Sequence, residues 1–137
     1  MWWIYALLSA FFAALTAIFA KLGIKGVNTD LATAIRTVVI LVIAWAIAFF
    51  RGGTATINTL SRQNLLFLCL SGIATGLSWI FYFKALQIGK VSQVAPVDKL
   101  SVALAILLSV IFLGEALTWK NAIGAIMIIG GTLVLIL

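Results

Sequence analysis

Histidine is absent from this 137-residue chain, and cysteine occurs only once. Without a histidine, a cysteine cluster or paired carboxylates, the sequence lacks the usual residues for metal ligation, for general-base catalysis at neutral pH and for thiol nucleophiles. We therefore expect no enzyme activity, no metal and no cofactor. The single Cys69 also excludes an internal disulfide.

Charged residues are scarce as well, at 9% of the chain against 65% hydrophobic residues. A water-soluble domain of this composition could not cover its surface with polar side chains. The net charge of +6 comes from basic residues that lie mostly at the ends of apolar segments. In those places they meet lipid headgroups, so the sequence predicts membrane lipid as a partner and excludes nucleic acid.

Apolar segments of membrane-spanning length recur five times along the chain. They predict helices at about residues 2–20, 31–50, 65–83, 91–114 and 119–137. Each is close to the ~20 residues that cross the hydrocarbon core. The connectors are too short for a soluble domain, and residues 51–64 are expected to form a solvated loop with an interfacial segment. The expected fold is a single all-α domain over residues 1–137, in the cell (plasma or inner) membrane.

The second predicted helix carries a cation inside the membrane. Thr29 or Asp30 is expected to cap its start, and Arg36 follows about six residues into it, roughly 9 Å along the axis. One interpretation is that Arg36 extends to the headgroups. The other is that it faces the interior of the bundle, where water or an anion can meet it.

Hydroxyl side chains share one face of the third predicted helix. The residues on and beside this face are Ser71, Thr75, Ser78 and Tyr82, with Gly72, Gly76 and Trp79. The face could be a packing surface through the two glycines, with the hydroxyls bonded to carbonyls of their own helix. It could equally line a translocation cavity, which the two aromatic residues with polar groups favour.

The fourth predicted helix places two opposite charges next to each other. It is expected to begin near Ser92, so that Pro96 falls in about the first turn, where its missing amide costs little. Asp98 and Lys99 follow about two turns in. Because neighbours on a helix point about 100° apart, they are not expected to pair with each other. Asp98 would then meet a cation of another helix, and Lys99 would stay available for an anion.

Several segments resemble the EamA domain of the drug/metabolite transporter superfamily. They are "KALQIGKVSQVAP", "LGEALT" and "GAIMIIGGTLVL" in the last 57 residues, with "TAIRTVVILVIAWAI" and the opening helix before them. The resemblance implies a half-transporter, since larger members carry two such five-helix units in inverted orientation. It therefore implies a homodimer, possibly antiparallel, or pairing with a different half-unit. Loop charges on the two sides are equal in number, so both orientations stay open.

Glu115 belongs to the "LGE" match and has two interpretations. Its carboxylate could cap the last helix near Thr118 and Trp119, or it could couple protons together with Asp98.

The number of charged residues inside the predicted spans indicates the charge of the substrate. The embedded cations Arg36, Lys84 and Lys99 outnumber the single carboxylate of Asp98. We therefore expect a secondary transporter that carries a small polar metabolite with a carboxylate or phosphate by alternating access. The predicted substrate-binding residues are Arg36, Thr75, Trp79, Tyr82, Asp98 and Lys99. The alternative is a non-transporting scaffold or an accessory half of a heterodimeric transporter.

Overall fold

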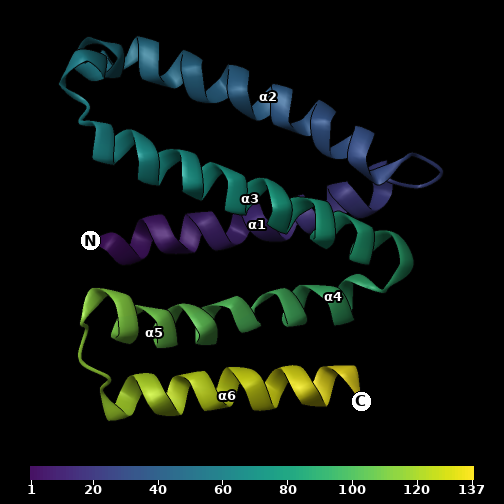
Figure 1. The fold of residues 1–137 in the computed structure, drawn as a ribbon. Coiled ribbons are helices and arrows are strands. Elements are labelled where there is room, and N and C mark those ends of the chain that lie inside the picture. The colour runs from purple at the N-terminus through teal and green to yellow at the C-terminus, as the bar shows by residue number, and fades with distance from the viewer. The chain divides into compact units, whose positions relative to one another are not determined.

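The computed structural model describes residues 1–137 and is entirely helical. Its elements are α1 (Trp2–Gly23), α2 (Thr29–Phe50), the 3-10 helix η1 (Gly53–Thr59), α3 (Arg62–Ile88), α4 (Val91–Asp98), α5 (Leu100–Leu113) and α6 (Trp119–Ile136) (Figure 1). Five spans are long and apolar enough to cross a membrane, with α4 and α5 together forming the fourth. The all-α membrane fold predicted from the sequence is confirmed.

The first three helices continue beyond the apolar limits that the sequence predicted, and the other two spans end one residue before theirs. The third span was expected over residues 65–83, but α3 covers Arg62–Ile88. Backbone hydrogen bonding extends a helix into the polar interface, where apolarity no longer marks it. The predicted cap of α2 was wrong by one residue. Asn28 is the cap, and its side-chain oxygen accepts the N–H groups of Asp30 at 2.8 Å and Leu31 at 3.1 Å.

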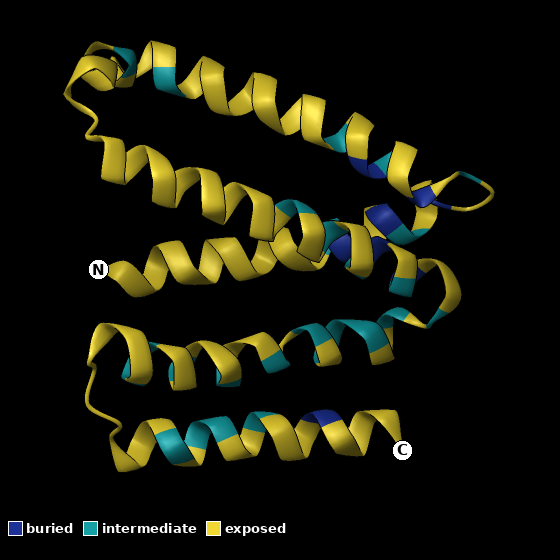
Figure 2. Ribbon diagram, viewed as in Figure 1, coloured by how far each residue is buried: buried dark blue, intermediate teal, exposed yellow.

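The chain divides into two compact units, one of residues 19–87 and one of residues 1–18 with 88–137. In the first unit, buried residues gather where α1 ends, α2 begins and α3 ends (Figure 2). They are Ala20, Ile24, Thr29, Thr33, Phe83 and Leu86. This small core holds the first turns of α2 against the last turns of α3.

Side chains at the edge of this core satisfy backbone carbonyls at the helix ends. The ammonium of Lys21 donates to the carbonyl of Leu86. The side-chain amide of Gln87 donates to the carbonyls of Ile24 at 3.3 Å and Val27 at 2.9 Å. The last carbonyls of a helix have no partner within it. These contacts therefore tie the turn after α1 to the end of α3.

In the second unit, α6 packs along both α4 and α5. The turn after α5 depends on Gly114, whose φ of 67° lies in the left-handed region that favours glycine. The N–H groups of Gly114 and Glu115 both bond to the carbonyl of Ser109. The chain then reverses direction and enters α6, which runs antiparallel beside α5 in Figure 1.

Candidate functional site

Arg36 lies seven residues into α2, about 10 Å along the helix axis. Its guanidinium carbon is 4.0 Å from the ring centroid of Phe83 and 5.7 Å from that of Trp79. Trp79 and Phe83 are four residues apart on α3, so they share one face. Both distances fall in the range of cation–π attraction, which holds the cation against α3.

One atom of this guanidinium is buried without a hydrogen-bond partner: Nη1 of Arg36. The five N–H donors of arginine lie in the plane of the group, so contact with a ring face leaves them unsatisfied. A buried donor on a cation is costly unless an acceptor meets it. The site therefore has an unused donor suited to an anionic acceptor.

Phe83 is the residue of this site that the sequence prediction omitted. It is 1% exposed, and Tyr82 contacts it with ring centroids 5.5 Å apart in an edge-on arrangement. The prediction placed Trp79 and Tyr82 beside the substrate, and the structure brings the rings of Trp79 and Phe83 to the Arg36 cation. The four-residue spacing from Trp79 was the signal that could have identified Phe83.

Thr75 is exposed and does not reach Arg36 through any hydrogen bond. Its hydroxyl donates to the Ser71 carbonyl of its own helix at 2.9 Å. No atom lies within 4 Å of a Cβ built on Gly72 or Gly76. The close glycine packing that the sequence allowed is therefore not formed within the unit of residues 19–87.

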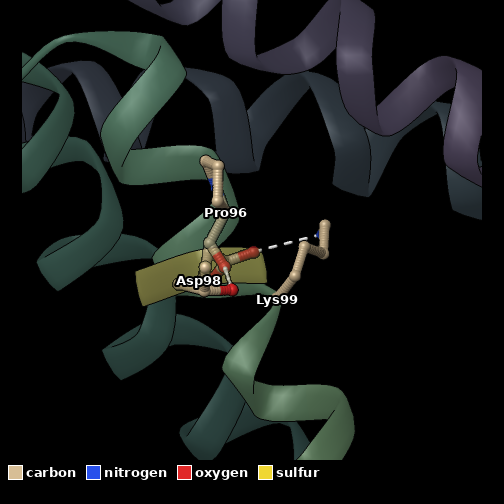
Figure 3. A network of polar contacts seen from close by, with 4 residues as sticks. Pro96, Asp98 and Lys99 are labelled. Atoms are coloured by element: carbon tan, nitrogen blue, oxygen red, sulfur yellow. Dashed lines mark hydrogen bonds and ion pairs between the residues drawn. The ribbon is translucent and has the colours of Figure 1, made fainter. Parts of the chain in front are cut away.

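Asp98 and Lys99 pair with each other, which corrects the expectation that each would need another partner. The Lys99 ammonium lies 3.2 Å from a carboxylate oxygen of Asp98 (Figure 3). The Lys99 side chain is 57% exposed and that of Asp98 is 33% exposed. The flexible lysine stem turns back to its neighbour at a point where the helix is interrupted.

The interruption has a visible cause in Pro96. Because α4 begins at Val91, Pro96 is its sixth residue, and the prediction that it lies in the first turn was wrong. Proline has no N–H to donate to the carbonyl four residues earlier, here that of Ser92. The Lys99 N–H is shared between the Ala95 carbonyl at 3.3 Å and the Pro96 carbonyl at 3.0 Å, and the shorter bond closes a tighter turn than in an α-helix. The charged pair lies at this junction of α4 and α5.

Glu115 does not cap α6. The N–H of Asn121 bonds to the hydroxyl of Thr118 at 3.2 Å, so Thr118 supplies the cap. Glu115 is exposed.

The whole chain, residues 1–137, matches the model of the EamA-like transporter family. The chain belongs to the EamA-like transporter family. A protein from Sinorhizobium sp. named "Uncharacterized transporter in cobO 3'region" is 48% identical over 134 residues, which cover 98% of this chain and 95% of that protein. No solved structure gives a significant match. The chain is thus a multi-pass membrane protein with a transporter role.

Within this EamA-like transporter, the predicted site residues fall in the two units. Arg36, Thr75, Trp79 and Tyr82 lie in residues 19–87, and Asp98, Lys99 and Glu115 lie in the unit that includes residues 88–137. The first unit holds a cation against aromatic rings. The second holds a paired carboxylate and ammonium at a helix break, which is the kind of interrupted span in which transporters bind substrates and ions.

Proposed function

We propose that this EamA-like transporter carries a small polar metabolite with a carboxylate or phosphate across the cell (plasma or inner) membrane. The observation that carries the proposal is the buried, unpartnered Nη1 of Arg36. An anionic group of the substrate would accept this donor, while Trp79 and Phe83 hold the guanidinium in place. Arginine suits this role because its planar donors match the oxygens of both anions.

The transport mechanism that we propose is alternating access in a dimer of five-helix units. Five spans place the two termini on opposite sides of a membrane, so an antiparallel homodimer would reproduce an inverted repeat. The similarity takes in 95% of the Sinorhizobium protein, which supports one such unit as the building block. Asp98 and Lys99 of each subunit of the dimer are proposed to contact the substrate. Asp98 and Glu115 are the candidates for proton coupling.

Counterflow in liposomes tests the substrate class. The purified protein is reconstituted and given a panel of anionic, zwitterionic and cationic metabolites, first as wild type and then as Arg36→Gln, Arg36→Lys and Phe83→Leu. A hydrogen bond to a charged group contributes about 1.5–3 kcal/mol. We therefore expect Arg36→Gln to raise the KM for an anion about ten- to hundredfold. Arg36→Lys keeps the charge but loses the planar donors, so its KM should lie between that of the wild type and that of Arg36→Gln.

Lys25→Gln is the matched control, because it removes one exposed cation from the turn before α2 without touching Arg36. It should leave the KM for the anion unchanged. Transport of cations alone, or an unchanged KM for the anion in Arg36→Gln, would reject the anionic substrate. Tags on both termini test the dimer, since an antiparallel arrangement exposes the N-terminal tag on both sides of the membrane.

A further inference from the structure

A groove of about 880 Å³ lies between the second half of α2, the helix η1 and the first half of α3. We call it the α2–η1 groove, and all of its lining residues belong to the unit of residues 19–87. They are Leu41, Ala44, Trp45, Ala48, Gly53, Thr54, Ile57 and Leu68. With Thr54 as the single hydroxyl residue among them, the lining suits a hydrocarbon chain and not a polar solute.

The wall that η1 contributes is fixed by local bonds. A Cβ built on Gly53 would lie 3.4 Å from the carbonyl oxygen of Ala48, so the chain approaches α2 closely here. The hydroxyls of Thr56 and Thr59 donate to the carbonyls of Gly53 at 2.8 Å and Thr56 at 2.7 Å. These bonds fix the shape of η1 beside the groove, and the only hydroxyl that lines the groove is that of Thr54.

The depth of the α2–η1 groove matches one leaflet of a bilayer. Its deepest α2 residue, Leu41, precedes the end of α2 at Phe50 by nine residues, or about 14 Å at 1.5 Å per residue. Half of the hydrocarbon core measures about 15 Å. The groove thus extends from the headgroup level to about the middle of the membrane, which is the length of one acyl chain.

Two cations flank η1, the helix that forms one wall of the α2–η1 groove. Arg51 follows the last residue of α2, and Arg62 is the first residue of α3. Both are exposed, and neither guanidinium forms a hydrogen bond or an ion pair. The only acid of this unit, Asp30, is in the first turn of α2, at the other end of that helix. An anionic headgroup would complement this end of the groove.

We propose that the α2–η1 groove binds an anionic phospholipid, with one acyl chain along Trp45 and Ala48 and the phosphate held by Arg51 and Arg62. The apolar lining, the depth of one leaflet and the two unpaired cations at the headgroup level support this one occupant. Arg51, which would hold the phosphate, follows the end of α2, whereas Arg36 is in the first half of that helix, so the lipid site uses none of the residues proposed to bind the substrate.

Native mass spectrometry of the purified protein with mixed lipids tests the proposal. Phosphatidylglycerol and phosphatidylcholine with identical acyl chains compete for wild type, Arg51→Gln/Arg62→Gln and Ala48→Phe. We expect wild type to retain phosphatidylglycerol preferentially. Each arginine near a headgroup favours an anionic lipid about fivefold, ~1 kcal/mol, so the double variant should lose about 25-fold of the preference. Ala48→Phe fills the groove and should weaken binding of both lipids.

Lys25→Gln/Lys120→Gln is the matched control, because it removes two exposed cations elsewhere in the chain. It should keep the preference for phosphatidylglycerol. The same loss in this control would assign the preference to overall charge and overturn the site, as would equal retention of the two lipids by wild type. Displacement by glycerol phosphate without acyl chains would identify a phosphate site and not a lipid site. Loss of bound lipid when the protein dimerises would show that a second copy of the chain occupies the groove. Because Arg51 and Arg62 are exposed, the Arg51→Gln/Arg62→Gln variant should fold, and it tests the lipid site even if Ala48→Phe does not fold.

Discussion

Replacing Thr132 with valine tests whether a hydroxyl of α6 fixes the bend of the fourth span. Thr132 is 4% exposed, and its hydroxyl donates to the Pro96 carbonyl of α4 at 3.2 Å. Three other α-helical threonines, Thr33, Thr37 and Thr75, bond to carbonyls of their own helix. Thr132 therefore forms a bond between helices, at the carbonyl that also accepts the N–H of Lys99.

The expected loss of stability is small and can be bounded. A hydrogen bond between membrane helices contributes about 0.6 kcal/mol on average and about 1.7 at most. In Thr132→Val the Pro96 carbonyl keeps its bond from Lys99 at 3.0 Å, so no acceptor is left unsatisfied. We expect the free energy of unfolding to fall by about 0.6 kcal/mol, near the average for such bonds. Thr132→Ser keeps the hydroxyl and should lose less.

Reversible unfolding in mixed micelles, followed by far-UV circular dichroism against the mole fraction of dodecyl sulfate, measures this difference. Amide hydrogen exchange of residues 97–102 provides a second readout, because loss of the bond should speed exchange around the helix break in the valine variant alone. A loss in the serine variant as large as that in the valine variant would mean that the hydroxyl contributes no more than the methyl group. Unchanged stability and exchange in Thr132→Val would refute the reasoning.

Two further substitutions separate backbone strain from charge. Gly114→Ala should destabilise the protein by about 1–2 kcal/mol, because residue 114 has a φ of 67°, which strains any residue with a Cβ. Nothing lies within 4 Å of the added Cβ, so a steric clash does not contribute. Thermal unfolding measures the loss, and unchanged stability would contradict the strain. Under the proposed function, Lys99→Gln leaves the Asp98 carboxylate without its partner, so it should impair anion counterflow more than Asp98→Asn/Lys99→Gln; equal impairment would remove the pair from the substrate path.

The number and type of spans could be predicted from the sequence because the thickness of the bilayer sets the length of an apolar segment. The helix ends could not, since α3 continues through Lys84 and Gln87, where polar residues keep helical hydrogen bonds. The position of the break at Lys99 also escaped prediction. It follows from Pro96, which the sequence prediction placed in about the first turn, where a proline does not interrupt a helix, and which is the sixth residue of α4.

The candidate site was predictable only in part, and Thr75 shows the reason. Its hydroxyl is satisfied by the Ser71 carbonyl of its own helix, so a polar face does not require a polar neighbour. Arg36 instead contacts the aromatic residues Trp79 and Phe83. Which face of α3 meets α2 is decided by the buried contacts of Phe83 and Leu86 with the ends of the helices. Those contacts lie far apart in the sequence, so the spacing of polar residues alone could not identify them.

The pairing of Asp98 with Lys99 changes how the charge of the substrate is inferred. Counting the embedded charges from the sequence gave three cations against one carboxylate, but the pair at 3.2 Å is neutral as a unit. Arg36 and Lys84 are then the cations left, and since Lys84 is exposed, the excess charge depends mainly on Arg36, whose Nη1 has no acceptor. One negative group is enough to complement it, so under the proposed function a monoanion satisfies the site. A zwitterion could in addition exchange partners with Asp98 and Lys99, carboxylate to ammonium and ammonium to carboxylate, without changing the net charge of that pair.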